Sequence, residues 1–403
     1  MRLKSKLLRV LSIGLPVIPL LFSTGCGSHH SAHMSGATEI LRAQPAGETE
    51  LFPAPLALNV PTSAAALNDT ARFLAGLPAL SGQNALPRLR AMNSWQSHNA
   101  QLNQMWHQFT LRHGAPVNAW ARSEIADLRD ANAVLYPFSG PDIVFPLLFF
   151  PRAETFVLCG LEPCEPLPVW SMLTATEVDS GLDGLVTSLS SILQYSYFIT
   201  KDMRHDMQST RFRGVLPIFL VFLARSGQIV ESVDAVRLDA NGVPVIYPAG
   251  QSTVPGLLIR ANGPGGPKRI FYFSQNLSDD SLKPGSPFLR FASSLGRPAA
   301  LLKSASYLMH ESYFSNIRNH LLTQTCGIVQ DPSGVPLHQF KEHNWSMSYY
   351  GNYEGPIDTF KQYPQPDLAA AYHDPANHAR PIDFSVGYLL NPRTTSLMVG
   401  RLR

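Results

Sequence analysis

The segment Ala131–Pro168 constrains the fold more than any other part of the sequence. It reads ANAVLYPFSGPDIVFPLLFFPRAETFVLCGLEPCEPLP. Two apolar runs, Val134–Tyr136 and Thr155–Leu161, are separated by a polar turn and by a third apolar run, Ile143–Phe150. Strand, polar loop, short helix and strand in that order are the outline of a parallel α/β unit. The segment therefore predicts an α/β fold.

Further along the chain, apolar spacing predicts a helical portion (63–131) and then a mixed α/β portion (132–403). Helical spacing predicts helices near 68–76, 95–112, 117–131, 182–197 and 299–323. Apolar and β-branched runs predict strands at 214–224, 229–238, 243–247, 257–261, 269–275, 326–331, 384–390 and 396–401. The expected fold is a mixed sheet with a Rossmann-like βαβ unit and added antiparallel hairpins, in a single domain over 63–403.

The start of the chain has the order of parts found in an export signal. Four basic residues precede an apolar run, Leu11–Phe22, and are Arg2, Lys4, Lys6 and Arg9. Ser23-Thr24-Gly25-Cys26 follows and resembles a bacterial lipobox, although Ser23 stands where leucine is commonest. The resemblance implies that residues 1–25 are removed and that Cys26 carries lipid such as palmitate. An ordinary secretory peptide or an uncleaved anchor is the alternative.

The expected lipid on Cys26 predicts a protein attached to a membrane of the cell envelope. Gly27 rather than aspartate follows the cysteine, which resembles sorting to the outer membrane, with the domain facing the periplasm. Residues 26–62 are rich in His, Ser, Ala, Pro and Gly and predict a flexible tether. The chain has 32 basic and 29 acidic residues, and four of the basic ones lie in the signal. This near-neutral balance gives no basic surface for nucleic acid.

No familiar catalytic pattern is present in the sequence. It contains no G-x-S-x-G, no G-x-x-x-x-G-K-[ST] and no G-x-G-x-x-G, and its histidines and cysteines do not have zinc-site spacing. The sequence therefore identifies no cofactor and no metal site. Cys159 and Cys164 could pair in an oxidising envelope, although Cys159 falls within a predicted strand.

The strongest candidate for a ligand site is the loop after the first strand of the central unit. Ser139, Gly140 and Asp142 lie there, where a parallel sheet has its ligand crevice and a helix N-terminus offers N–H groups to an anion. Glu162 ends the next strand about 20 residues later, where an acid in such folds binds a ribose hydroxyl. The alternatives are that Asp142 caps the helix and that Glu162 caps a turn.

Two further polar clusters supply candidate site residues. Asp279 and Asp280 follow the strand predicted at 269–275 and would lie at a sheet edge, unless they only form a turn and cap a helix. Ser306 and His310 are four residues apart on the helix predicted at 299–323 and would share one face. A Ser–His pair without an orienting acid is weak evidence for a nucleophile.

Four phrases in the sequence, YPFSGPD, FFPRAETFVLCGLEP, KSASYLMH and YPQPDLAAAY, are similar to a group of exported bacterial proteins of uncharacterised function. The resemblance covers most of residues 64–390 and supports a single domain, but it implies no catalytic residue. Three functions are therefore open. The first, which the missing catalytic patterns favour, is a lipoprotein that binds a small ligand or an envelope protein. The others are an envelope hydrolase or transferase with an acidic site at the strand ends, and a scaffold that docks through aromatic residues 345–353.

Overall fold

The computed structural model describes residues 58–196, 210–247, 254–389 and 393–403. These residues belong to one unit, Thr49–Arg403. Cys26, the predicted signal peptide and the tether up to residue 57 lie outside the described residues. Within the described part of the chain, no helix combines the length and the apolar character needed to cross a membrane.

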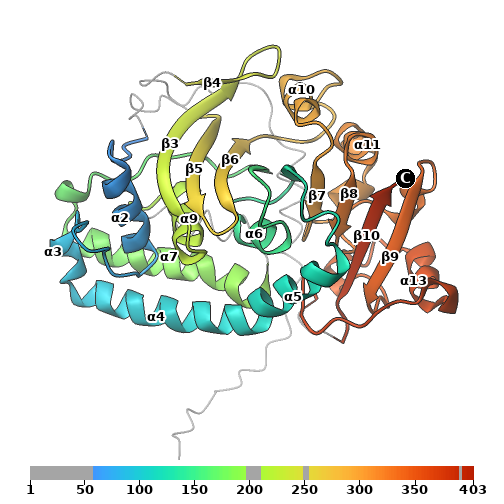
Figure 1. Ribbon diagram of the computed structural model, residues 1–403, viewed down its shortest axis with the longest axis horizontal. Coiled ribbons are helices and arrows are strands. Elements are labelled where there is room, and N and C mark those ends of the chain that lie inside the picture. Colours follow the sequence, from blue (N-terminus) through green and yellow to red (C-terminus); the bar gives the residue numbers. More distant parts are fainter. Residues whose placement is uncertain (1–57, 197–209, 248–253, 390–392) are drawn as a thin grey trace, which may run out of the picture. The chain divides into compact units, whose positions relative to one another are not determined.

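A mixed sheet forms the centre of the unit (Figure 1). Among the described residues it has ten strands in the order β4-β3-β5-β6-β2-β1-β7-β8-β10-β9. The strands are β1 (Ala133–Tyr136), β2 (Thr155–Gly160), β3 (Ile229–Leu238), β4 (Pro244–Ile246), β5 (Gly256–Gly263), β6 (Gly266–Ser274), β7 (Ala299–Leu302), β8 (Gly327–Gln330), β9 (Trp345–Gly351) and β10 (Ser396–Leu402). The predicted α/β fold with parallel strands and antiparallel hairpins is confirmed.

The parallel part of the sheet has a doubly wound order. Strands β6, β2, β1, β7 and β8 pair side by side in parallel, while β5 and β10 join the two ends of this block in antiparallel pairs. Numbered along the chain, the five parallel strands lie in the spatial order third, second, first, fourth, fifth. The direction of winding reverses between β1 and β7, so the carboxyl ends of these two strands form the topological switch point, the place where such sheets bind ligands.

Helices cover both faces of the sheet. They are α2 (Ala64–Leu74), α3 (Pro87–Arg90), α4 (Asn93–Phe109), α5 (Ala115–Glu124), α6 (Val144–Phe149), α7 (Ala175–Tyr195), α9 (Leu216–Arg225), α10 (Pro287–Ser294), α11 (Ser315–Gln324), α12 (Leu337–Phe340) and α13 (Pro366–His373). A π-helical turn joins α4 to α5. Short 3₁₀ helices lie at Trp170–Met172, Leu308–His310, Ser312–Phe314, Asp358–Phe360 and Pro375–Asn377.

Ring contacts on β6 show which helices lie on which face. Tyr272 packs against Phe219 of α9, with ring centroids 5.5 Å apart. The residues on either side of it, Phe271 and Phe273, pack against Phe291 of α10 at 5.0 and 5.7 Å. Because successive strand residues point to opposite faces, α9 and α10 cover opposite sides of the sheet. Figure 1 shows α10 and α11 together on one side and α4, α7 and α9 on the other.

The strand predicted at Gly214–Ala224 is wrong, because this segment forms the helix α9. Every residue from Leu216 to Ala224 is buried. A helix that is apolar all round lacks the polar positions that reveal a period of 3.6 residues, so a short buried helix and a buried strand look alike in sequence.

The helix predicted at 299–323 is also wrong. The chain forms β7, then a loop, two 3₁₀ turns and α11. Ser304, Ser306 and Tyr307 have φ angles of 55°, 51° and 56°, which no right-handed helix allows. The strand β7 consists only of Ala and Leu, which favour helices. Its sequence therefore gives no indication that it forms a strand.

No strand forms in the described part of the segment predicted at 384–390. The Thr395 hydroxyl lies 3.2 Å from the Val386 nitrogen and 3.1 Å from its carbonyl oxygen, so a side chain replaces the ladder bonds of a strand.

The aromatic segment 345–353 forms the edge strand β9. Its Tyr349, Tyr350 and Tyr353 are buried, and Trp345 donates a hydrogen bond to the Leu322 carbonyl, so these rings do not make an exposed docking patch.

Candidate functional site

Four buried ionisable side chains lie at the carboxyl ends of the parallel strands. Asp142 follows β1, Glu162 follows β2, Lys303 follows β7 and Asp331 follows β8. Their residues are 1%, 3%, 3% and 1% exposed. Charged groups are almost never buried to this degree unless they are paired and hydrogen-bonded. The cluster at the switch point is therefore the candidate functional site.

An ion pair joins β1 to β7 across the switch point. Lys303 Nζ lies 3.0 Å from Asp142 Oδ2, and the Tyr136 hydroxyl donates to the same oxygen at 2.8 Å. Lys303 Nζ also donates to the Ser196 carbonyl at the end of α7 and lies 4.2 Å from the centroid of the Phe145 ring. Burial and the negative charge of Asp142 raise the pKa of Tyr136, which keeps its hydroxyl protonated as a donor.

Asp142 also bonds to the first turn of the short helix α6. Its Oδ1 accepts a hydrogen bond from the Phe145 backbone N–H at 3.2 Å. The N-cap residue of α6 is Ile143, so Asp142 makes this bond from one position before the N-cap and is not the N-cap itself, and its other role is the ion pair with Lys303. A carboxylate at this helix N-terminus occupies the position that an anionic ligand would otherwise take.

Ser139 and Gly140 tie the β1 loop to the end of β2. The backbone N–H groups of both residues donate to the Cys159 carbonyl, at 2.8 and 3.1 Å, and the Ser139 hydroxyl accepts from the Cys159 N–H at 3.2 Å. Cys159 and Cys164 are free, buried thiols, and burial raises the pKa of both. Ser139 thus positions the loop through contacts with backbone.

Glu162 lies against two glycines at the ends of β1 and β2. A Cβ on Gly140 would come within 3.1 Å of Glu162 Oε1, and a Cβ on Gly160 within 2.0 Å of Oε2. Gly140 has a φ of +54°, a conformation that glycine adopts without strain. The Tyr272 hydroxyl lies 3.0 Å from Glu162 Oε2 and donates to this residue. The two glycines therefore make the room in which the carboxylate lies.

Asp331 holds the loop that follows β7. It accepts hydrogen bonds from the backbone N–H groups of Ser304 at 2.8 Å and Ser333 at 2.9 Å, and from the Ser333 hydroxyl. A Cβ on Gly387 would lie 1.9 Å from its Oδ2, so that glycine leaves space for the carboxylate. Burial raises the pKa of Asp331, while these hydrogen bonds and the charge of Lys303 oppose the rise.

The loop Ser304–Tyr307 stores backbone strain beside these groups. Three of its residues have left-handed φ angles, and such residues persist only where the surroundings hold them. The Tyr388 hydroxyl donates to the Ser304 carbonyl at 2.8 Å and accepts from the Ser306 N–H at 3.0 Å. Strain of this kind clusters at functional sites, which agrees with the position of the loop at the switch point.

Asp279 and Asp280 have roles outside this cluster. The Asp279 carboxylate accepts from the Ser315 N–H at 3.1 Å, the Ser315 hydroxyl at 2.7 Å and the Asn316 N–H at 2.8 Å. Asp279 therefore satisfies donors at the start of α11 through a contact between distant parts of the chain, whereas the expected cap alternative was local. Asp280 is exposed to solvent.

His310 lies in a 3₁₀ turn and not on a long helix. Its ring packs against Tyr307 and Tyr363, with centroids 5.0 and 5.7 Å apart. The Ser306 hydroxyl lies 3.0 Å from the Tyr388 hydroxyl. The shared helix face that would have brought Ser306 and His310 together does not exist, because φ of Ser306 is positive. Burial lowers the pKa of His310 to about 4.

Sequence reasoning missed several members of the cluster. Asp331 ends the correctly predicted strand at 326–331, just before a Pro-Ser-Gly turn, so the strand-end rule that selected Glu162 could also have selected it. Sequence reasoning does single out Lys303 with Ser306 and His310, but on the helix predicted at 299–323 it cannot be paired with Asp142. Tyr136 and Tyr272 lie inside strands, where a tyrosine is expected for packing alone.

Comparisons of the chain with protein-family models, with curated proteins and with solved structures found no match. In the described ranges, no three His, Cys, Asp or Glu side chains are grouped so that they could hold a metal ion. The function must therefore be argued from the geometry of the site.

We expect Lys303→Met to lower the free energy of unfolding by about 3–5 kcal/mol, because it leaves Asp142 buried without its cation. The double variant with Asp142→Asn should lose less stability than Lys303→Met alone. Urea unfolding followed by circular dichroism measures both. The control is Arg152→Met, in the exposed pair whose side chains are 69% and 60% exposed, which should change stability by about 0–1 kcal/mol. A Lys303→Met variant as stable as the wild type would contradict the role given to the pair.

The low pKa of His310 predicts a dependence of stability on pH. The folded protein binds a proton at this site only near pH 4, whereas an unfolded chain binds it near 6.5, so protonation favours unfolding between these values. The wild type should therefore lose stability relative to His310→Asn as the pH falls from about 6.5 to about 4. Urea midpoints measured across this range provide the test, with the exposed His107→Asn as control. A constant difference between the wild type and His310→Asn would refute the assignment.

Proposed function

We propose that this chain is a lipid-anchored protein of the cell envelope whose α/β domain binds a small ligand at the carboxyl ends of β1, β2 and β7. The observation that carries the proposal is the buried cluster at the switch point of a doubly wound sheet, which is where such sheets bind ligands. The lipid anchor rests on the signal-like first 26 residues and on Cys26.

The ligand is a compound that carries a ribose or a similar pair of neighbouring hydroxyls. Glu162 ends the second parallel strand, the position from which an acid accepts hydrogen bonds from ribose hydroxyls in doubly wound folds. Its neighbours Gly140 and Gly160 carry no side chain, and the space that this leaves holds the Glu162 carboxylate at the strand ends. Tyr272 fixes the carboxylate through a hydrogen bond.

The charge at α6 argues for a nucleoside in preference to a nucleotide. In dinucleotide-binding folds the pyrophosphate lies at the N-terminus of the helix after the first strand. Here Asp142 occupies that N-terminus and bonds to the Phe145 N–H. A second negative group at the same place would be repelled by this carboxylate and would compete with it for the same donor.

The second candidate function is an envelope transferase or hydrolase that works at the same strand ends. Asp331 favours it, because burial raises the pKa of this carboxyl beside the charged Lys303. A carboxyl with a raised pKa at a crevice is a candidate acid or base for proton transfer. Conversion of a bound nucleoside that stops in Asp331→Asn, with binding retained, would favour this function over binding alone.

Equilibrium dialysis of the full chain in detergent micelles with adenosine tests the proposed ligand class. We expect saturable binding that is at least about tenfold weaker in Glu162→Gln, because a charge-assisted hydrogen bond is lost. 2′-Deoxyadenosine should bind more weakly by a similar factor, since it lacks the 2′-hydroxyl that the proposal pairs with Glu162. Adenosine diphosphate should gain nothing over adenosine.

Glu231→Gln, at an exposed position on β3, is the matched control and should bind adenosine like the wild type. Binding that is equal in the wild type and in Glu162→Gln, or the lack of saturable binding of adenosine, would overturn the nucleoside proposal.

The lipid anchor predicts that Cys26→Ala moves the protein from the membrane fraction to the soluble fraction of cells. Acylation supplies the membrane affinity, since each buried CH₂ contributes about 0.8 kcal/mol and the described helices supply no membrane span. Cell fractionation and mass measurement of the mature N-terminus check this. Cys326→Ala, which changes a free cysteine of the domain, should leave the protein at the membrane. Retention of Cys26→Ala in the membrane fraction would count against the anchor.

A further inference from the structure

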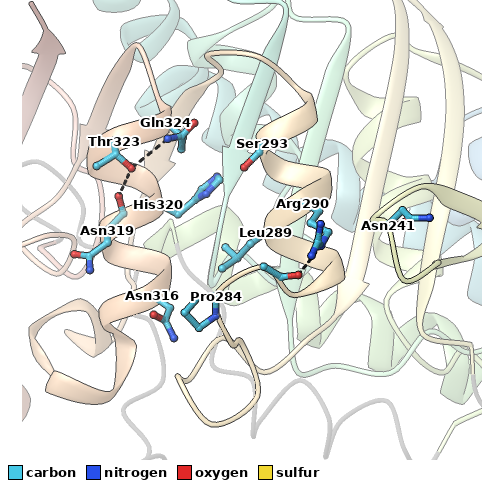
Figure 2. Close-up of a pocket in the computed structure, with 11 residues that line it drawn as sticks. Asn241, Pro284, Leu289, Arg290, Ser293, Asn316, Asn319, His320, Thr323 and Gln324 are labelled. Carbon is cyan, nitrogen blue, oxygen red and sulfur yellow. Dashed lines mark hydrogen bonds between the residues drawn. The ribbon is translucent and has the colours of Figure 1, made fainter.

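A groove lies between α10 and α11, and its lining shares no residue with the carboxyl-end cluster. Its volume is about 550 Å³, within the ~300–1,000 Å³ range of small-molecule sites. Figure 2 shows the two helices side by side, with the β3–β4 turn at the far end. The groove is lined by Asn241, Pro284, Gly285, Leu289, Arg290, Ser293, Asn316, Asn319, His320, Thr323 and Gln324. The hydrogen-bond partners of the Asp142–Lys303 pair, which are Tyr136, Phe145 and Ser196, do not line the groove.

His320 is a buried polar side chain whose Nε2 atom has no hydrogen-bond partner among the described residues. The residue is 8% exposed, and its Nε2 atom is buried. In Figure 2 its ring points from α11 toward α10, into the groove. Burial lowers the pKa of His320 to about 4, so the ring is neutral at pH 7 and Nε2 can donate or accept according to its tautomer. A buried polar atom of this kind calls for a partner, and the ring that carries it points into the groove.

Arg290 supplies the positive charge of the groove. Its Nε donates to the Gly285 carbonyl at 2.7 Å, which holds the guanidinium at the groove while the residue remains exposed. Gly285 has a φ of +71°, so this tight turn before α10 suits glycine. The lining contains no aspartate or glutamate. A carboxylate ligand would therefore meet a cation and no repelling charge.

The rest of the lining matches hydroxyl groups. Four amide side chains and two hydroxyls belong to the lining: Asn241, Asn316, Asn319, Gln324, Ser293 and Thr323. Three of their donors are used within the protein, because the Asn316 amide donates to the Leu282 carbonyl, the Thr323 hydroxyl to the Asn319 carbonyl and the Gln324 amide to the Thr323 hydroxyl. Their oxygens and the other donors can meet hydroxyl groups. Leu289 and Pro284 add apolar surface against which the C–H face of a small ring can pack. Convergent polar groups with a limited apolar floor are typical of sites for small polar ligands.

We propose that the α10–α11 groove binds a small hydroxylated carboxylate, such as a sugar acid. The carboxylate pairs with Arg290, His320 Nε2 bonds to the same molecule, and the amides take its hydroxyls. This site is independent of the nucleoside site proposed above, since the two share no residue.

Isothermal titration calorimetry of the full chain in detergent micelles tests this site, with D-glucuronate as the probe. We expect saturable binding that weakens at least about tenfold in Arg290→Ala and in His320→Ala, as loss of a charge-assisted or buried hydrogen bond implies. Arg297→Ala, at an exposed arginine just after α10, is the control and should bind like the wild type. Because Arg290 is exposed, its variant tests the site even if His320→Ala lowers stability.

The neutral sugar D-glucose and inorganic phosphate separate the two parts of the proposal. Glucose should bind at least about tenfold more weakly than glucuronate because it cannot pair with Arg290. Phosphate should bind more weakly than glucuronate because it uses few of the amides. The proposal is overturned if glucuronate shows no saturable binding, if Arg290→Ala binds it as tightly as the wild type, or if glucose or phosphate binds equally well.

Discussion

The buried ion pair between Lys303 and Asp142 is the interaction on which the arrangement at the switch point depends. Moving both charges out of water costs several kcal/mol per ion, and mutual attraction offsets this only with good geometry and further hydrogen bonds. The protein supplies these from separate elements: the Tyr136 hydroxyl on β1, the Phe145 N–H on α6 and the Ser196 carbonyl after α7. The pair therefore fixes β1, β7, α6 and the end of α7 relative to one another, and it sets the electrostatics of the crevice.

The loop after β7 extends the same constraint toward β8. Asp331 and Tyr388 bind the backbone of Ser304, and Tyr388 also binds Ser306, so a segment with three left-handed residues stays in one conformation. The result is a cluster of three buried carboxyls and one buried cation. The α10–α11 groove has the opposite character, with an exposed arginine, a neutral buried histidine and no acid. We therefore propose different ligands for the two regions: an uncharged nucleoside at the carboxyl-end cluster, and a carboxylate in the groove.

Sequence reasoning placed Asp142 and Glu162 after the first two parallel strands, as the structure has them, because the rule it used is local. A polar residue after a buried strand lies at a sheet edge, and this placed Asp142 and Glu162 near each other before any coordinates. The same rule gave Asp279, whose carboxylate instead caps α11 because the chain brings Ser315 and Asn316 to it. The rule gave no means of pairing Lys303 with Asp142. The two residues are far apart in the chain, and a long-range ion pair has no characteristic spacing by which the sequence could reveal it.

The sequence by itself determined the α/β class, the βαβ unit at 131–168 and most strands, because alternation, turn residues and apolar runs act over short distances. Only the tertiary structure decided that Gly214–Ala224 is a helix and that Ala299–Leu302 is a strand. Both segments are buried on all sides, so their local patterns carry no period and long-range pairing chooses between helix and strand. The strand order, the switch point, the Lys303–Asp142 pair and the groove around His320 were likewise decided there. Each depends on contacts between residues that the sequence separates, and those contacts exist only once the sheet has formed.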